Sequence, residues 1–144
     1  MSEKVYIAAD HAGYSLKQKI IEKFPTLVDL GPSDESRVDY PDFAEKVAKS
    51  VAQSKSKGIL VCGSGIGMAI SANKVAGVRA ASAWDVTSAR LSREHNDANV
   101  LCLGARLTGV EVALEIVATF LKTPFEGGRH QQRVDKMTAL EGKK

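Results

Sequence analysis

The stretch whose residue types could most readily carry out chemistry covers residues 61–74 and reads VCGSGIGMAISANK. A thiol, Cys62, is followed by a loop that contains Gly63, Ser64, Gly65 and Gly67. Closely spaced glycines let the backbone curl so that several N–H groups point into one cavity, and a following helix adds the positive end of its dipole. The pattern predicts an anion hole with Cys62 at its rim as a candidate nucleophile or base. A small buried hydrophobic residue is the alternative that this spacing leaves open.

Two common phosphate-binding motifs do not fit the loop. The dinucleotide fingerprint G-x-G-x-x-G needs a third glycine, but the sixth position is Met68 counted from Gly63 and Ile70 counted from Gly65. The P-loop needs Gly-Lys-Ser/Thr, and no such triplet follows. The sequence therefore disfavours a nucleotide at this loop.

Other ionisable side chains stand near predicted element ends. Asp10 either caps the next helix or takes part in catalysis, and spacing favours neither. His11 follows the first strand, where a ligand would approach. His95 by itself is typical of a helix C-terminus, where a cation is favoured. Cys102, inside VLCLGA, is expected to be a buried structural thiol.

The elements that must position these groups alternate along the chain. The strand-like runs are apolar throughout, which indicates strands buried on both faces and hence a parallel sheet covered by helices on both sides. The sequence predicts a three-layer α/β/α sandwich, with a Rossmann-like five-stranded parallel sheet and a C-terminal helix, forming a single domain over residues 1–144. Strands are expected at 4–9, 26–30, 58–62, 77–81 and 100–103, and helices near 16–24, 41–51, 68–74, 87–96, 108–121 and 129–140.

Two further expectations follow from this arrangement. In open parallel sheets ligands bind beyond the carboxyl ends of the strands, where Asp10, Tyr40, the glycine loop and Arg106 should gather. The residues from Thr108 to Glu111 are expected to form a capping box that opens the long helix.

Composition narrows the class of protein. The chain has 144 residues, 44% of them apolar, which suits one compact domain. No run approaches the roughly 18 apolar residues of a membrane span, and the first residues show no leader, so we expect a soluble cytoplasmic protein with no membrane partner. The net charge of +3, with acids and bases interleaved, gives little support to nucleic-acid binding. The two cysteines and three histidines match no zinc spacing, so no metal is expected.

Six motifs in order closely resemble the type B ribose-5-phosphate isomerases, within the sugar-phosphate isomerase family that also contains allose-6-phosphate and galactose-6-phosphate isomerases. The resemblance runs from about Lys4 to Leu140, nearly the whole chain. The motifs are Asp10-His11-Ala12-Gly13, Asp39-Tyr40-Pro41, Cys62-Gly63-Ser64-Gly65-Ile66-Gly67, Ser71-Ala72-Asn73-Lys74, Arg93-Glu94-His95-Asn96-Asp97 and Gly127-Gly128-Arg129-His130-Gln131-Gln132-Arg133.

The resemblance implies an aldose-ketose isomerase that interconverts ribose 5-phosphate and ribulose 5-phosphate through a cis-enediolate, without a cofactor, in the pentose phosphate pathway. It implies Cys62 as the base at C2, His95 as the ring-opening group and Asp10 as its assistant. The substrate-binding residues that it implies are His11, Tyr40, Gly63, Ser64, Gly65, Gly67, Asn96, Arg106, Arg129 and Arg133. The two arginines of the last motif lie at i, i+4 and so share a helix face.

The resemblance also implies a homodimer, or a tetramer made of two dimers, with an active site shared between subunits. On this basis one subunit is expected to supply His95, Asn96 and Arg106, and the other Asp10, His11, Cys62, Arg129 and Arg133. Two alternatives stay open. One is an isomerase of allose 6-phosphate or galactose 6-phosphate on the same scaffold, and the other is a non-catalytic domain that binds a phosphosugar.

Overall fold

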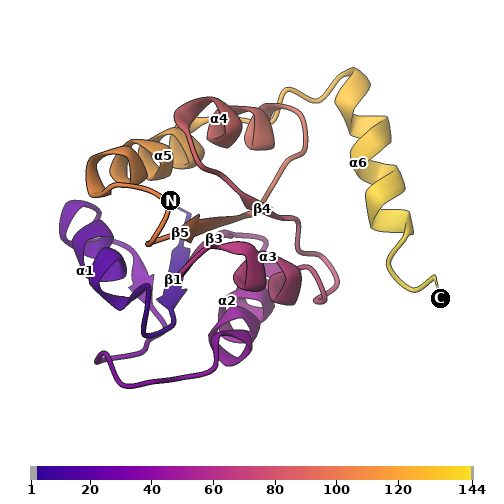
Figure 1. Ribbon diagram of the computed structural model, residues 1–144. Coiled ribbons are helices and arrows are strands. Elements are labelled where there is room, and N and C mark those ends of the chain that lie inside the picture. The colour runs from indigo at the N-terminus through magenta and orange to yellow at the C-terminus, as the bar shows by residue number, and fades with distance from the viewer. Residues whose placement is uncertain (1–2, 144) are drawn as a thin grey trace.

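The computed structural model describes residues 3–143 and consists of a five-stranded sheet between two layers of helices (Figure 1). The strands are β1 (Val5–Ala9), β2 (Val28–Asp29), β3 (Lys57–Cys62), β4 (Ala80–Ser82) and β5 (Val100–Gly104). The helices are α1 (Tyr14–Lys23), α2 (Tyr40–Ser54), α3 (Ile66–Ala72), α4 (Val86–Glu94), α5 (Val110–Lys122) and α6 (Arg129–Ala139). The predicted α/β/α sandwich is confirmed.

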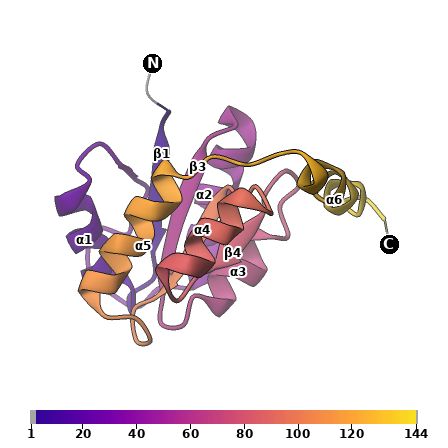
Figure 2. The ribbon, with the colours of Figure 1, turned by 90° about the horizontal axis from the view of Figure 1, so that it is seen from above.

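All strand pairs are parallel, in the order β2-β1-β3-β5-β4. β3 lies at the centre, and its last residue, Cys62, pairs with Gly104 at the end of β5. Helices α1, α4 and α5 cover one face of the sheet, and α2 and α3 cover the other (Figures 1 and 2). The carboxyl ends of β1, β3 and β5 therefore meet at one edge, with the glycine loop at the middle of it.

Two hydrophobic cores lie on the two faces of the sheet. Successive residues of a strand point to opposite faces, and accordingly Ile59 and Val61 belong to the core under α1, α4 and α5, while Leu60 and Cys62 belong to the core under α2 and α3. All four are buried. This is why the sequence of β3 is a continuous apolar run. Burial of each aliphatic side chain contributes about 1.5–3 kcal/mol to the free energy of folding.

Several predicted boundaries differ from the structure. The ladder of β4 begins at Ala80 rather than residue 77, and α3 begins at Ile66, so that Gly67 lies inside the helix. The predicted capping box is wrong: Gly109 is the N-cap of α5, and the Thr108 hydroxyl is buried without a hydrogen-bond partner among residues 3–143. The chain turns into the helix one residue later than the motif suggested, so the Thr108 side chain cannot reach the helix amides.

Helix α6 stands to one side of the sandwich in both views (Figures 1 and 2). Its buried residues are His130 and Val134, and the rest of its surface is exposed. It covers nearly the range predicted for the last helix. Within residues 3–143, no helix is long and apolar enough to cross a membrane.

Candidate active site

A cavity of about 490 Å³ opens at the carboxyl edge of the sheet, where the sequence placed the ligand site. Its wall combines the thiol, the glycine loop, a carboxylate, a phenol and a guanidinium. The lining residues are Asp10, Tyr40, Cys62, Gly63, Ser64, Ile66, Gly67, Ile70, Arg106 and Leu107.

The glycine loop wraps around the sulfur of Cys62. The Gly65 amide donates a hydrogen bond to Cys62 Sγ at 3.1 Å, and the Cys62 side chain is almost fully buried. This turn needs glycine, because Gly65 has φ +81° and a Cβ there would lie 3.1 Å from the Leu103 carbonyl carbon. The Ser64 hydroxyl accepts from the Ile66 amide at 3.2 Å and so braces the same turn. The loop thus aims a backbone donor at the sulfur.

Tyr40 closes one wall of the cavity because residue 67 has no side chain. A Cβ at Gly67 would lie 2.5 Å from Tyr40 Cε1 and 2.6 Å from Cζ. The Tyr40 ring thus rests directly on the backbone of α3, with its hydroxyl free to turn toward a ligand. Arg106 lies across the loop from it, with Nη1 3.3 Å from the position of a Cβ on Gly63.

Asp10 and His11 follow β1 at the same edge. Asp10 is buried, and its Oδ1 accepts from the Gly13 amide at 2.9 Å. This bond shapes the turn before α1, whose N-cap is Gly13, so Asp10 is not the helix cap itself. His11 Nδ1 accepts from the Val38 amide at 3.3 Å, which places the proton of the neutral ring on Nε2, the nitrogen left for a ligand.

A buried lysine that the sequence reasoning missed holds the segment between β2 and α2. Lys17 is fully buried, and its ammonium donates to both carboxylate oxygens of Asp29 at 2.8 and 2.9 Å and to the Pro32 carbonyl at 2.8 Å. The segment it holds leads to Val38 and Tyr40. Nothing in the helical pattern around Lys17 marks it as buried. Its role becomes visible only through its partners Asp29 and Pro32, which lie 12 and 15 residues away in the sequence.

The remaining predicted site residues lie elsewhere in the chain. His95 is the C-cap of α4, and this helix leads away from the carboxyl edge of the sheet over nine residues, roughly 13 Å. Asn96 is exposed beside it, and Arg129 and Arg133 lie on α6, where His130 packs on His95. A single chain therefore presents two separate groups, one around Cys62 and one around His95.

Within one chain, the residues are grouped differently from the two sets expected from the sequence. Arg106 was expected beside His95 and both α6 arginines beside Cys62. In the structure Arg106 lines the cavity of Cys62 because the turn after β5 lies against the glycine loop, with the Arg106 amide donating to the Gly63 carbonyl at 3.0 Å. The two α6 arginines accompany His95, because α6 is attached to the end of α4.

The second cysteine has no part in the cavity. Cys102 lies in β5 and is 1% exposed. Burial raises the pKa of the Cys102 thiol, and repulsion from Cys62 raises it further. It stays a protonated core residue, as the sequence predicted.

Near His95, three side chains form the group that comes nearest to a metal site among residues 3–143. Nitrogens of His95 and His130 and an oxygen of Glu126 all lie within 4.8 Å of one another. The two imidazole rings are stacked, however, with centroids 4.3 Å apart and planes 15° apart. A metal ion lies close to the plane of each imidazole that binds it, and two rings stacked face to face are poorly placed to direct nitrogen lone pairs at one ion. The geometry suits ring packing better than metal binding.

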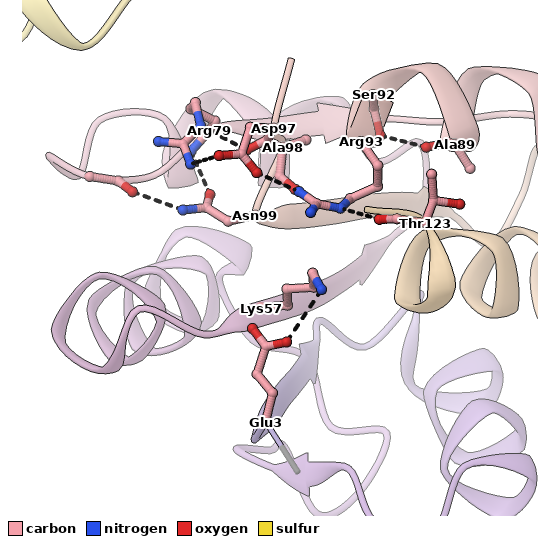
Figure 3. Close-up of polar contacts among 11 residues, drawn as sticks. Glu3, Lys57, Arg79, Ala89, Ser92, Arg93, Asp97, Ala98, Asn99 and Thr123 are labelled. Carbon is pink, nitrogen blue, oxygen red and sulfur yellow. Dashed lines mark hydrogen bonds and ion pairs between the residues drawn. The ribbon is translucent and has the colours of Figure 1, made fainter. Parts of the chain in front are cut away.

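A second hollow, of about 450 Å³, lies at the amino edge of the sheet (Figure 3). Five of its charged side chains form ion pairs with one another. Asp97 accepts from Arg93 Nη1 at 2.9 Å and from Arg79 Nη2 at 3.3 Å, and Lys57 donates to Glu3 at 3.3 Å. The two arginine contacts of Asp97 hold the turn that follows His95. The hollow contains none of the predicted catalytic groups.

Comparison with known proteins identifies the family. A family model described as ribose/galactose isomerase matches residues 5–137. The chain belongs to the ribose/galactose isomerase family. Ribose-5-phosphate isomerase B of Escherichia coli K12 is 45% identical over 96% of this chain and 97% of its own length. The family and the isomerase class expected from the sequence are thus confirmed.

Solved structures of ribose/galactose isomerases share the whole fold. Ribose-5-phosphate isomerase B of Clostridium thermocellum superposes with a TM-score of 0.95 at 47% identity and covers 97% of this chain and 98% of its own. The enzyme of Mycoplasma genitalium with bound ribulose-5-phosphate gives a TM-score of 0.95 at 45% identity, over 100% of this chain and 99% of its own. At 45–47% identity, these matches support membership of the same family as well as a shared fold.

Proposed function

We propose that this protein is an aldose-ketose isomerase that interconverts ribose 5-phosphate and ribulose 5-phosphate, with Cys62 as the base. The observation that carries the proposal is the glycine loop, which turns a backbone amide onto Cys62 Sγ inside a cavity also lined by a carboxylate, a phenol and a guanidinium. The relatives named ribose-5-phosphate isomerase B, one of them with bound ribulose-5-phosphate, support the choice of substrate.

The proton transfer uses the groups around the loop. In the open-chain aldose the Cys62 thiolate takes the proton from C2, the C2–H electron pair becomes the C1=C2 double bond, and negative charge moves to O1. The loop amides that the sulfur does not occupy stabilise that charge. Return of the proton to C1 and transfer of the O2 proton to O1 then give the ketose. No atom is gained or lost.

Ring opening has to come first, because the sugar is mostly cyclic. His95 suits this step, since an imidazole exchanges a proton near neutral pH. His95 does not meet Cys62 within one chain, so the proposal requires a second copy of the chain. We place Cys62, Asp10, His11 and Tyr40 of one subunit opposite His95 of the partner subunit, in a homodimer.

The same pairing supplies the cations for the phosphate. Arg106 contributes from the Cys62 side, and Arg129 and Arg133 come with His95 from the partner subunit, together with Asn96 for a substrate hydroxyl. Arg129 and Arg133 are exposed and lie one turn apart on α6, which projects from the sandwich (Figure 1). A projecting basic helix is suited to reach over a neighbouring subunit and clamp a phosphate through two guanidinium groups.

Exchange of the C2 proton with solvent tests the proposal. Wild type in D₂O should convert ribose 5-phosphate to ribulose 5-phosphate with kinetics visible by ¹H NMR, and Cys62→Ala should lose both isomerisation and deuterium incorporation by on the order of 10³-fold. Cys102→Ala is the matched control and should keep wild-type rates. Isomerisation by Cys62→Ala at the wild-type rate would exclude the thiol as the base.

A further inference from the structure

Three successive residues at the end of α4 contact the segment 123–130, which leads into the first turn of α6. Arg93 Nε donates to the Thr123 carbonyl at 3.0 Å (Figure 3), and the Glu94 carbonyl accepts from the Glu126 amide at 3.2 Å. The third contact is the stack of His95 on His130. The position of His95 therefore depends on the segment 123–130, not only on its own helix.

His130 is the part of this attachment that touches the ring of His95. It is 6% exposed, although it lies in the first turn of an otherwise exposed helix. Its Nε2 lies 3.5 Å from Glu126 Oε1, so the carboxylate lies at an edge of the His130 ring while His95 stacks on its face. A Glu126 oxygen also lies within 4.8 Å of a nitrogen of His95. Within residues 3–143, no hydrogen bond reaches a ring nitrogen of His95. The stack is thus the contact that sets the plane of the His95 ring.

We propose that His130 is a positioning residue, which holds the His95 ring in the orientation needed to open the sugar. The inference rests on the proposed function, because it gives His95 the ring-opening role. His130 does not touch the substrate itself in this account. It acts through the face of its ring, while Glu126 Oε1 lies 3.5 Å from Nε2 at the ring edge.

The position of His130 also links two parts of the proposed site. Arg129 and Arg133, the proposed phosphate ligands, stand on either side of it in the same helix. Packing of His130 on His95 therefore fixes the group that acts at the sugar ring relative to the cations that hold the phosphate. A pentose phosphate has a fixed span between these two points, so this link would favour it over longer sugars.

A double-mutant cycle with His95 tests the inference. Kinetics with ribose 5-phosphate would be measured for wild type, His130→Ala, His95→Ala and the double variant. We expect His130→Ala to lower kcat/KM by about tenfold, the scale of a lost aromatic pair. In the His95→Ala background the same substitution should change the rate less than about twofold, because the group it positions is gone.

Two further variants separate stacking from general loosening of α6. His130→Phe keeps a ring for His95 and should retain most of the wild-type rate. Val134→Ala removes the other buried contact of α6 and should have the same effect with or without His95. An equal cost of His130→Ala in both backgrounds, no cost at all, or a folded His130→Phe as slow as His130→Ala would each overturn the inference.

NMR spectra recorded without substrate test the stack of His130 on His95 independently of the proposed function. The chain has only three histidines, so their Cε1–H resonances can be assigned one by one in ¹H–¹³C spectra. Ring current from the aromatic side chain at position 130 should shift the His95 resonance upfield in wild type and in His130→Phe but not in His130→Ala. An unchanged His95 resonance in folded His130→Ala contradicts the stack. An inactive wild type with the expected shifts would instead refute the proposed function and retain the stack.

Discussion

Replacement of Gly67 by alanine should raise the stability of the fold but lower the activity. The new methyl group would stand 2.5 Å from Tyr40 Cε1, whereas ordinary contact begins near 3.4 Å, so the ring has to retreat by about 1 Å. Tyr40 is 41% exposed, and its ring is the far end of a flexible side chain, so it can move without disturbing a core. Gly67 lies inside α3 without a positive φ, which means that alanine suits the backbone there.

The expected effects on the free energy of unfolding and on kcat/KM have opposite signs. Alanine in place of glycine should stabilise the helix by up to about 1 kcal/mol. If Tyr40 binds a substrate hydroxyl as the resemblance implies, its displacement should remove a hydrogen bond worth about 1 kcal/mol and so lower kcat/KM by about three- to tenfold. Gly104→Ala is the matched control. Its methyl group would meet the Ser64 backbone at 2.6 Å, which cannot yield, so it should destabilise the fold by about 2 kcal/mol.

Urea unfolding and steady-state kinetics on ribose 5-phosphate check these values, together with a Tyr40→Ala background. In that background Gly67→Ala should cost little further activity, because the ring that it displaces is absent. A Gly67→Ala protein with wild-type kcat/KM would refute the reasoning. So would a loss of the same size with and without Tyr40, since the methyl group would then act by filling the cavity.

Three other substitutions or reactions test separate features. Lys17→Met breaks a buried ion pair and should lower the free energy of unfolding by about 3 kcal/mol, whereas Lys49→Met at an exposed pair should cost less than about 0.5 kcal/mol in the same urea titration. Thr108→Val should stabilise the protein by about 1 kcal/mol, because it removes a buried hydroxyl without a partner; a loss of stability would restore the capping box. Iodoacetamide at neutral pH should label Cys62 and spare Cys102, whose raised pKa keeps it a thiol, and mass spectrometry showing equal labelling would contradict this.

The sequence was sufficient for the layers of the fold and for half of the site. Strands that are apolar at every position, such as β3, predict a sheet buried on both faces, and the order of strand and helix predicts parallel pairing. Because parallel strands end at one edge, Asp10, Cys62 and Arg106 could be placed together from their positions alone.

The rest depended on contacts between segments far apart in the chain. Periodicity places Lys17 and Thr108 in or beside helices but says nothing of the partner that the first finds in Asp29 or the second lacks. The sequence also could not tell whether the α6 arginines lie near His95 or near Cys62 within one chain, because that depends on the path of residues 123–128. The stack of His95 on His130 was missed for the same reason: 35 positions separate two rings whose centroids lie 4.3 Å apart.

Subunit mixing tests the shared active site most directly. Cys62→Ala and His95→Ala proteins, each expected to keep only a small residual activity alone, would be combined in equal amounts under conditions that exchange subunits, with exchange verified by mass spectrometry of the intact dimers. Half of the dimers formed at random are hybrids, and each has one intact site, so the mixture should recover about a quarter of wild-type activity on ribose 5-phosphate. Full exchange with no recovery would show that Cys62 and His95 do not act across the two subunits.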